Sequence, residues 1–431
     1  MYLTLNEVTS EIIDKRGVTV KKLGGEFVED GHRVISAKLI KKSKVDLDAG
    51  EKRFVNHKIY KKWMSSKLQE GDVILTSEAP LGEVAYIKEN LDWCLGQRLF
   101  CLRPNREIID GRYLYYALKT KQVQADLESR GTGTTVIGIR QSELLNVQIP
   151  IQDLETQKRI SNLLGGLDDK IELNQQMNEN LEEIARTLFK SWFIDFDPVR
   201  AKAEGRPTGL SKEISDLFPD SFEDSELGEI PRGWSKSIIT DIANKISDKY
   251  KKDEGWSNEK LIDLSRMPSN SISLTSHGRG DELSTSVCKF KKYDFLFGSI
   301  RPYFYKAGIC PYDGVSNTSV FILRAKKSYD KEFMYFYSSS DITFERSVQY
   351  SDGTKMPIIK WNDFKEFPFA LPNEELRKQF SSIINPVVDK IILNIDEQKV
   401  LSELRDALLP RLISGELQIT DAENLVEEAG I

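Results

Sequence analysis

Two six-residue stretches that lie 220 positions apart and differ at one position decide the fold: Asp169-Lys170-Ile171-Glu172-Leu173-Asn174 and Asp389-Lys390-Ile391-Ile392-Leu393-Asn394. The surrounding sequence keeps nearly the same offset, because the Gly131-Thr132 turn matches Gly353-Thr354 and the segment from Pro150 to Gln157 matches the segment from Pro372 to Gln379. Solenoid repeats have periods of roughly 20–50 residues, which is far shorter. The chain therefore contains two copies of one whole domain, each followed by one linking element.

Each linking element has the spacing of a coiled coil. Apolar residues recur at steps of three and four that alternate apart from one repeated three-residue step, with polar residues at matching positions of the two stretches. The predicted seam positions are Leu164, Leu167, Ile171, Asn174, Asn178, Leu181, Ile184 and Leu188, and Ile384, Val387, Ile391, Asn394, Gln398, Leu401, Leu404 and Leu408. Each stripe could instead cover its own domain, but their equal register favours two helices that pack against each other in antiparallel orientation. Asn174 and Asn394 cost stability in such a seam but fix its register.

Two breakers predict where these helices start. Gly165-Gly166 lies near the beginning of the first stretch and Asn385-Pro386 near the beginning of the second. Glycine and proline disfavour the helix interior, so we expect a short leading turn before each long helix. The long helices should then span about 167–193 and 387–414, a length of roughly 40 Å at 1.5 Å per residue.

The sequence before each helix is mixed in character. Segments 72–76, 83–87 and 99–102 are short, rich in branched and aromatic residues, and bounded by Gly, Pro or Asn, which predicts strands. Residues 111–129 predict a helix, with a counterpart at 331–346. We therefore predict an α+β fold: two homologous α/β domains joined by two long antiparallel coiled-coil helices with a pseudo-two-fold repeat. The predicted division is 1–151 first domain, 152–196 first helix, 197–230 linker, 231–372 second domain, 373–415 second helix and 416–431 C-terminal tail.

The charge alternates along the chain in step with this repeat. The 431 residues have a net charge of −6, which by itself does not suggest a nucleic-acid binder. Residues 1–150 carry 24 basic and 20 acidic groups, and residues 231–372 carry 22 and 17. The two remaining blocks, 151–230 and 373–431, are acidic, with 9 basic against 18 acidic groups and 6 against 12. Two basic domains that alternate with two acidic helical segments are consistent with DNA contact by the domains.

Several other classes of protein are disfavoured. The four cysteines form no CxxC pair, so reduced thiols are the simpler interpretation, and the three histidines lie far apart, which argues against a metal site. No apolar run approaches the ~20 residues that span a bilayer, and the first residues lack the pattern of a signal peptide. We therefore expect a cytoplasmic protein.

The sequence contains no complete catalytic motif. Gly131-Thr132-Gly133 begins a dinucleotide fingerprint, but Val136 replaces the third glycine, and no phosphate-binding GxxxxGK[ST] loop occurs. Asp197-Pro198-Val199 lacks the second proline and the aromatic residue of an amino-methyltransferase loop, so Pro198 is better explained as the stop of the long helix. We expect neither catalysis nor a cofactor in this chain.

The remaining signals favour binding to DNA. Small hydroxyl-rich turns at 130–135 and 351–355 let backbone N–H groups approach an anion, although an ordinary surface turn would look alike. Basic and aromatic residues interleave at 58–67, 289–293 and 301–306, where the alternative is a solvated strand edge. The candidate DNA-binding residues are Lys67, Ser77, Arg130, Thr132, Thr134, Arg279, Arg301, Tyr303, Lys306, Thr354 and Lys355.

The sequence resembles a known family, the DNA specificity subunits of type I restriction–modification enzymes. The resemblance covers essentially the whole chain, through the two repeats with their long helices and the Pro-x-x-x-Leu-x-x-Gln lead into each helix. Three stretches are most typical: LFKSWFIDFDPVR at 188–200, AEGRP at 203–207 and LGEIPRGW at 227–234.

The resemblance implies a function for each part. The two domains would be target-recognition domains, each reading one half of a split double-stranded DNA sequence. The helices would dock two modification subunits, which carry S-adenosylmethionine and methylate adenine, and restriction subunits that use ATP and Mg would complete the nuclease. The alternatives are an autonomous DNA-modifying enzyme with a degenerate active site, the specificity subunit of a methyltransferase-only or related type II system, and a coiled-coil scaffold with no DNA role. The bases that are read depend on side-chain placement in the groove and do not follow from the sequence.

Overall fold

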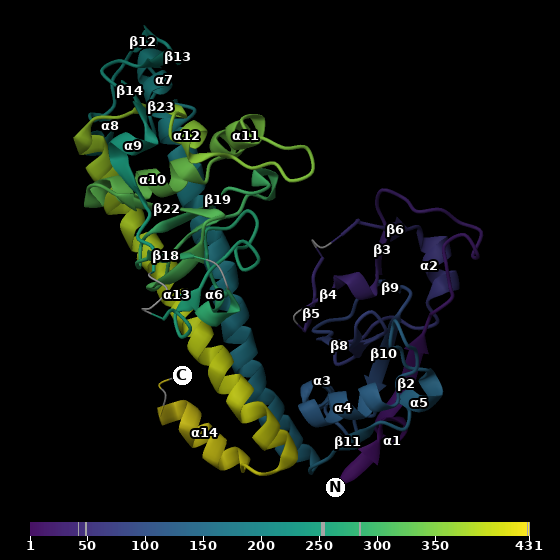
Figure 1. The fold of residues 1–431 in the computed structure, drawn as a ribbon. Helices are drawn as coiled ribbons and strands as arrows, with labels where there is room; N and C mark the ends of the chain where they lie inside the picture. The colour runs from purple at the N-terminus through teal and green to yellow at the C-terminus, as the bar shows by residue number, and fades with distance from the viewer. Residues whose placement is uncertain (42, 48–49, 251–254, 284–285, 429, 431) are drawn as a thin grey trace. The chain divides into compact units, whose positions relative to one another are not determined.

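The computed structural model describes residues 1–41, 43–47, 50–250, 255–283, 286–428 and 430 (Figure 1). The chain forms two compact units. Unit 1 contains residues 1–170 and 401–431, and unit 2 contains residues 171–400. Each long helix therefore contributes one part to each unit. The α+β class and the two similar domains with coiled-coil helices are confirmed.

The core of unit 1 is an antiparallel four-stranded sheet in the order β2 (Thr9–Asp14), β10 (Leu99–Pro104), β7 (Val73–Ser77) and β8 (Leu81–Tyr86). Every residue of β7 is buried, because α3 (Gly111–Lys119) covers one face and a smaller sheet packs on the other. The other elements of this unit before the long helix are β1 (Tyr2–Thr4), α1 (Leu5–Val8), β3 (His32–Ile35), η1 (Ala37–Leu39), β4 (Ile40–Lys41), β5 (Lys44–Val45), β6 (Phe54–Val55), α2 (His57–Trp63), β9 (Cys94–Leu95), α4 (Lys121–Ser129), α5 (Gln141–Leu144) and β11 (Gln148–Pro150).

Unit 2 repeats this arrangement. Its antiparallel sheet has the order β15 (Ala243–Ile246), β22 (Val320–Ala325), β19 (Phe295–Gly298) and β20 (Ala307–Ile309), and α10 (Lys331–Ser338) packs on it as α3 does in unit 1. The remaining elements of the domain are β14 (Ser235–Ile238), α9 (Ile239–Ile242), β16 (Lys260–Leu261), β17 (Gly278–Arg279), η2 (Gly280–Glu282), β18 (Val287–Phe290), η3 (Pro302–Phe304), β21 (Gly314–Asn317), η4 (Ser328–Asp330), α11 (Asp341–Gln349), α12 (Trp361–Phe364) and β23 (Pro368–Leu371).

The long helices start earlier than the breakers predict. α6 spans Leu154–Phe193 and α13 spans Glu374–Ser414, so each is roughly 60 Å long instead of 40 Å. Gly165 does not break α6, because its lack of a side chain leaves room for the Arg112 guanidinium, which donates to the Gly165 carbonyl at 3.0 Å. α13 continues through Pro386, next to Asn385, whose side chain accepts from Lys331 and donates to Asp389. Tertiary contacts thus outweigh local propensity at both sites.

Within unit 2 the two helices pack against each other in antiparallel orientation. The Asn178 amide donates to the Ile391 carbonyl at 3.2 Å, and the Asn394 amide donates to Asn178 Oδ1 at 2.7 Å. Asn174 is also buried, but its amide donates to Glu397 Oε2 at 2.8 Å. The partner of Asn394 is therefore Asn178, and the seam contains a chain of polar contacts that specifies the register.

The predicted seam needs one correction after Asn178. Ile184 is 60% exposed and does not belong to the buried stripe, whereas Glu182, Ala185 and Phe189 are buried. Here the helix turns its buried face toward the domain of unit 2. The Glu182 carboxylate accepts from both serine hydroxyls of Ser271–Ser273, at 2.9 and 2.5 Å, and from the backbone N–H between them. A heptad pattern could not reveal a buried carboxylate that has its partners on the domain. The burial of the other predicted positions is as follows: Leu164, Leu167, Asn174, Asn178, Ile384, Ile391, Asn394, Gln398, Leu401 and Leu408 are buried, and Ile171, Leu181, Leu188, Val387 and Leu404 are half-buried.

The segment 197–230 is folded, although its composition predicts a linker. It contains α7 (Asp197–Ala203), α8 (Lys212–Ser215) and a hairpin of β12 (Phe222–Ser225) and β13 (Gly228–Pro231). Val199, Phe218 and Ile230 are buried in the same apolar cluster as Trp192 and Trp234. A few spaced apolar residues thus anchor a segment that is otherwise charged and rich in glycine.

The C-terminal segment also contains a helix, α14 (Ile419–Glu428), where the sequence suggests only a tail. Ile419, Ala422 and Val426 are buried in unit 1, and Glu423 forms an ion pair with Arg159 at 2.5 Å. Among the described residues, no helix combines the length and the apolar character needed to cross a bilayer.

Candidate nucleic-acid interface

Both units carry the same closed loop after their domain helices. In unit 1, Thr132 and Gly138 exchange two backbone hydrogen bonds, at 2.8 and 3.0 Å. In unit 2, Asp352 and Ile358 do the same at 3.1 and 2.9 Å. A glycine with positive φ turns each loop, Gly133 at +121° and Gly353 at +100°. Gly353 therefore corresponds to Gly133, and the sequence match of Gly353 with Gly131 is wrong by two residues. The turns predicted from the sequence are therefore closed hairpin tips, which we call the unit 1 loop (130–138) and the unit 2 loop (351–358).

Each loop is attached to the turn that follows the central strand of its sheet. The Ile139 N–H donates to the Ser77 carbonyl at 2.9 Å, and the Ile359 N–H donates to the Ser299 carbonyl at 3.0 Å. In unit 2 the Arg301 N–H also donates to the Pro357 carbonyl at 2.7 Å. Each unit thus brings two distant sequence segments together at one end of its sheet.

Three predicted residues of unit 1 lie at this place, in different environments. Thr132 and Thr134 are exposed on the loop, where their hydroxyls are accessible to solvent or to a ligand. The side chain of Ser77 is buried at 2% exposure, so Ser77 holds the loop through its backbone. A buried hydroxyl cannot contact DNA unless the loop moves.

Arg130 begins the unit 1 loop but is already paired. Its Nε lies 2.9 Å from Asp126 Oδ1, and its Nη1 lies 4.0 Å from Glu143. Asp126 in turn accepts from the Gln148 N–H at 2.8 Å. This arrangement fixes the guanidinium against the domain and lowers the free positive charge available to phosphate.

The unit 2 loop presents its cation differently. Thr354 and Lys355 are exposed, and within the described part of the chain Lys355 has no ion-pair partner. The neighbouring Lys360 pairs with Asp352 at 2.6 Å, and this hydrogen bond raises the pKa of Lys360. Lys355 is therefore the loop cation with the least competition for a phosphate.

An arginine and two aromatic rings stand beside the unit 2 loop. Arg301 has a φ of +50°, a conformation that residues other than glycine rarely adopt, and its side chain is exposed. Tyr303 and Phe304 on η3 are 45% and 43% exposed, with ring centroids 4.7 Å apart. Exposed aromatic rings next to cations can contact bases or sugars while the cations meet phosphates.

Three predicted residues lie away from the loops. Lys67 pairs with Asp92 at 2.7 Å, and Arg279 pairs with Asp281 at 2.9 Å. Lys306 donates to the Leu264 carbonyl at 2.5 Å. Their charges serve local structure in this state.

Sequence reasoning missed two matching basic residues. Arg140 and Lys360 are separated by the repeat offset, and each is the exposed residue that precedes the short helix after its loop. Large apolar side chains also lie exposed on the loops: Val136 and Ile137 in unit 1 and Met356 in unit 2. The offset of 220 residues, applied to the loops, would have paired Arg140 with Lys360 and Val136 with Met356, whereas their exposure is seen only in the structure.

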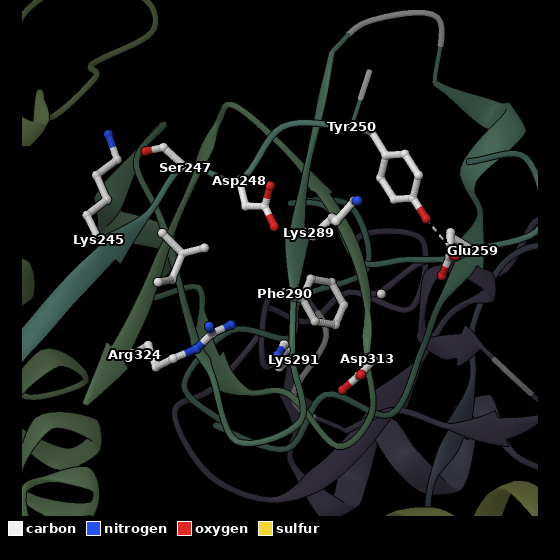
Figure 2. A pocket seen from close by; sticks show the side chains of 12 residues that line it. Lys245, Ser247, Asp248, Tyr250, Glu259, Lys289, Phe290, Lys291, Asp313 and Arg324 are labelled. Atoms are coloured by element: carbon white, nitrogen blue, oxygen red, sulfur yellow. Dashed lines mark hydrogen bonds between the residues drawn. The ribbon is translucent and has the colours of Figure 1, made fainter. Parts of the chain in front are cut away.

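A pocket of about 510 Å³ opens elsewhere in unit 2, beside β15, β18 and β22 (Figure 2). The Tyr250 hydroxyl donates to Glu259 Oε1 at 2.9 Å, and the Lys289 ammonium lies 4.1 Å from the Tyr250 ring centroid. The Arg324 guanidinium is bound by Asp294 at 2.6 and 2.7 Å. These contacts are a hydrogen bond, a cation–π contact and an ion pair to Asp294 outside the lining, and none of them aligns a nucleophile with a base.

The described residues meet the requirements of neither a metal site nor a reactive thiol. Across those residues, no group of three His, Cys, Asp or Glu side chains is placed to hold a metal ion. All four cysteines are buried and free, and burial raises the pKa of Cys94 to about 12. These thiols remain protonated and behave as small core side chains.

The duplicated domain, the paired loops and the helix pair are together typical of one class, a DNA-recognition protein that presents two similar reading surfaces. Comparison with known proteins agrees. The family model described as the type I restriction modification DNA specificity domain matches residues 10–183.

Relatives extend the likeness over most of the chain. The type I restriction enzyme MjaIX specificity subunit of Methanocaldococcus jannaschii is 28% identical over 385 residues, which cover 86% of this chain and 83% of the relative. The type I restriction enzyme HindI specificity subunit of Haemophilus influenzae is 26% identical over 416 residues, which cover 81% of this chain and 87% of the relative. The crystal structure of a type I restriction–modification S subunit from M. genitalium has a similar fold, with a TM-score of 0.56 at 17% identity over 96% of this chain and 95% of that one. The chain is therefore similar, over most of its length, to the specificity subunits of type I restriction–modification systems.

Proposed function

We propose that this chain is a specificity subunit that reads a two-part DNA sequence, one part with each unit. The observation that carries the proposal is the duplicated loop, closed by equivalent hydrogen bonds but carrying different side chains. The unit 1 loop presents Thr132, Thr134 and apolar residues, whereas the unit 2 loop presents Thr354 and the unpaired Lys355. Two loops with the same backbone arrangement but different side chains are suited to reading two different half-sites in neighbouring grooves.

The helix pair is proposed to dock two modification subunits. In unit 2, the helices leave four large apolar side chains open to solvent: Leu173, Ile184, Leu393 and Val400, each between 52% and 61% exposed. Exposed apolar side chains on the outer faces of a paired helix suit a partner protein. The modification subunits would supply S-adenosylmethionine and methyl transfer to adenine, and restriction subunits would supply ATP- and Mg-dependent cleavage.

In this proposal the chain has no catalysis of its own and works in the cytoplasm, where its DNA target lies. The alternative, an autonomous enzyme with a degenerate site, requires turnover by the isolated chain. Methyl transfer should be measured with the purified chain alone, with modification subunits alone, and with both together. We expect adenine methylation only in the combined sample, and methylation by the isolated chain would refute the proposal.

A second measurement separates the restriction system from the methyltransferase-only alternative. Restriction subunits, ATP and Mg are added to the combined sample, and cleavage of unmethylated DNA that carries the recognised sequence is followed. We expect cleavage that depends on this chain. Methylation without any such cleavage would indicate the methyltransferase-only system.

A further inference from the structure

The positive charge of unit 1 is concentrated in one segment. Residues 15–72, between β2 and β7, contain 15 Lys and Arg against 8 Asp and Glu, a net charge of +7. The topologically equivalent segment of unit 2, residues 247–294 between β15 and β19, contains 9 against 8, a net charge of +1. The whole chain has a net charge of −6. Of the two equivalent segments, the one in unit 1 therefore has by far the larger excess of positive charge.

Helix α2 displays part of this charge on one face. Lys58, Lys61 and Lys62 have the i, i+3, i+4 spacing that places side chains next to each other, and all three are exposed. The opposite face of α2 is held in the core by Tyr60 and Trp63, and the Trp63 indole donates to the Leu95 carbonyl at 3.0 Å. These core contacts fix the orientation of α2, and so they keep its three lysines on the exposed face.

A neighbouring segment adds two more lysines to the same face. The Lys62 ammonium donates to the Leu23 carbonyl at 3.3 Å, which places the segment that holds Lys21 and Lys22 against the lysine face of α2. A Cβ at Gly25 would lie 2.4 Å from the Ile59 side chain, so this segment packs directly on the helix. We call these five residues the α2 lysine cluster: Lys21, Lys22, Lys58, Lys61 and Lys62.

The cluster has no internal counter-charge. Among the described residues, none of its members is in an ion pair, in contrast to the nearby Lys67, which pairs with Asp92 at 2.7 Å. Clustered exposed ammonium groups repel one another, and an external polyanion that releases its counterions on binding removes this repulsion.

The cluster is joined to the unit 1 loop by one short segment. Arg16 Nη1 donates to the Ile139 carbonyl at 3.1 Å, at the end of the loop, and Leu23 contacts α2 seven residues later. Seven residues span at most about 25 Å. This is less than the ~34 Å of one turn of B-DNA, so a single duplex can reach both the loop and the cluster.

We propose that the α2 lysine cluster binds the phosphate backbone of double-stranded DNA flanking the half-site that unit 1 reads. This inference rests on the proposed function, since the loop must face DNA for the cluster to meet its flank. The cluster supplies affinity and no base specificity, because ammonium groups on phosphates carry no sequence information. The equivalent segment of unit 2 lacks such an excess of positive charge, so phosphate contacts contribute more to DNA affinity at the half-site of unit 1 than at that of unit 2.

The test uses the complex of the full chain with its modification subunits. The triple variant Lys58→Gln, Lys61→Gln, Lys62→Gln is compared with a control that removes the same charge from three exposed lysines of unit 2: Lys212, Lys236 and Lys326. DNA affinity is measured over a range of salt concentrations, with a duplex that contains the methylated site and with duplexes shortened at either end. Each lysine that meets a phosphate contributes about one to the slope of log K against log salt.

We expect the triple variant to lower the slope by about two to three and to leave the methylated sequence unchanged. Shortening the DNA on the unit 1 side should then weaken the wild type but not the variant. The inference is overturned if the wild type binds specifically while the triple variant matches the control. It is also overturned if the variant loses its modification subunits, which would assign the cluster to a protein partner. Failure of the proposed function differs from both, because the wild-type complex itself would then show no sequence preference.

Discussion

Unit 1 and unit 2 anchor their sheets with the same buried ion pair. In unit 1, Arg103 donates to both carboxylate oxygens of Asp72, at 3.0 and 2.9 Å. In unit 2, Arg324 donates to both oxygens of Asp294, at 2.6 and 2.7 Å. Both aspartates are almost fully buried, and each precedes the central strand of its sheet. The repeat therefore preserves the parts that position the loop as well as the loop itself.

The repeated helix motif shows where the units diverge. Asp169 accepts from Arg112 and Lys88 in unit 1, whereas its counterpart Asp389 accepts from Tyr293 and Asn385 in unit 2. One carboxylate is thus held by cations and the other by neutral donors. The repeat preserves where a helix meets its domain, while the partners that hold it there are free to change.

The greatest loss of stability should follow from removing the shared ion pair. Asp72→Ala should cost about 3 kcal/mol, because among the described residues it leaves the mostly buried Arg103 with Glu11 alone as an anionic partner. Asp294→Ala should cost less, since Arg324 is 38% exposed and water can solvate its charge. Hydrogen exchange in each sheet measures both effects. Equal loss of protection in the two variants would contradict this ranking.

The two loops should also respond unequally to the same substitution. Gly133→Ala would place a Cβ 2.2 Å from the Val136 carbonyl, whereas the same change at Gly353 leaves 3.1 Å to the Met356 carbonyl. Both positions also have positive φ, which costs an alanine about 1–2 kcal/mol. We expect Gly133→Ala to abolish specific binding of the half-site that unit 1 reads. Gly353→Ala should only weaken specific binding of the half-site that unit 2 reads. DNA affinity with one half-site altered at a time distinguishes the two, and a stronger effect of Gly353→Ala would be the contrary result.

The two loop cations should differ according to their pairing. Lys355→Ala should lower the salt slope of DNA binding by about one, if the side chain meets a phosphate. Arg130→Ala should change the slope less, because Asp126 and Glu143 already neutralise this guanidinium. Affinity titrations over several salt concentrations measure both slopes. Unchanged affinity in both variants would remove the loops from the interface.

The weakest of these effects is a pH dependence confined to unit 1. Burial raises the pKa of Asp169, but hydrogen bonds from Arg112 and Lys88 outweigh it, so the pKa is lowered overall. A lowered folded-state pKa adds stability above the unfolded value of about 3.9, and this stability disappears as the pH falls through the folded value. Asp169 is half exposed, so the contribution is at most about 1 kcal/mol. Asp169→Asn should therefore reduce the loss of unfolding free energy as the pH falls below about 4. An unchanged pH dependence would argue against the contribution of the Asp169 ion pairs with Arg112 and Lys88.

Much of this organisation could be predicted because it repeats. The matching DKI motifs at Asp169 and Asp389 reveal the duplication, and the hydroxyl-rich turns mark the loops by their composition alone. The repeat failed to predict features that depend on contacts between distant residues. Gly165 resembles a helix breaker, but Arg112 occupies the space that a side chain there would need. Glu182 resembles a solvent-facing charge, but it is buried with its serine partners.

The environments of the candidate DNA-binding residues were the hardest to predict for the same reason. Ser77 and Arg130 remain predictions, but the side chain of Ser77 is buried and that of Arg130 forms an ion pair with Asp126, and neither property follows from composition. Arg140 and Lys360 were missed, although they occupy equivalent places after the two loops. Composition identifies the type of side chain, whereas exposure and pairing are properties of the fold.

Separate reading of two half-sites by the two units can be tested by mapping methylated adenines in cells that carry this chain with its modification subunits. The wild type should mark a single two-part sequence, whose halves are separated by a fixed number of unread bases. Replacing the unit 1 loop, residues 130–138, with a glycine-serine loop of equal length should abolish recognition of one half only. A single uninterrupted recognition sequence, or loss of both halves from the change in one loop, would contradict the assignment of one half-site to each unit.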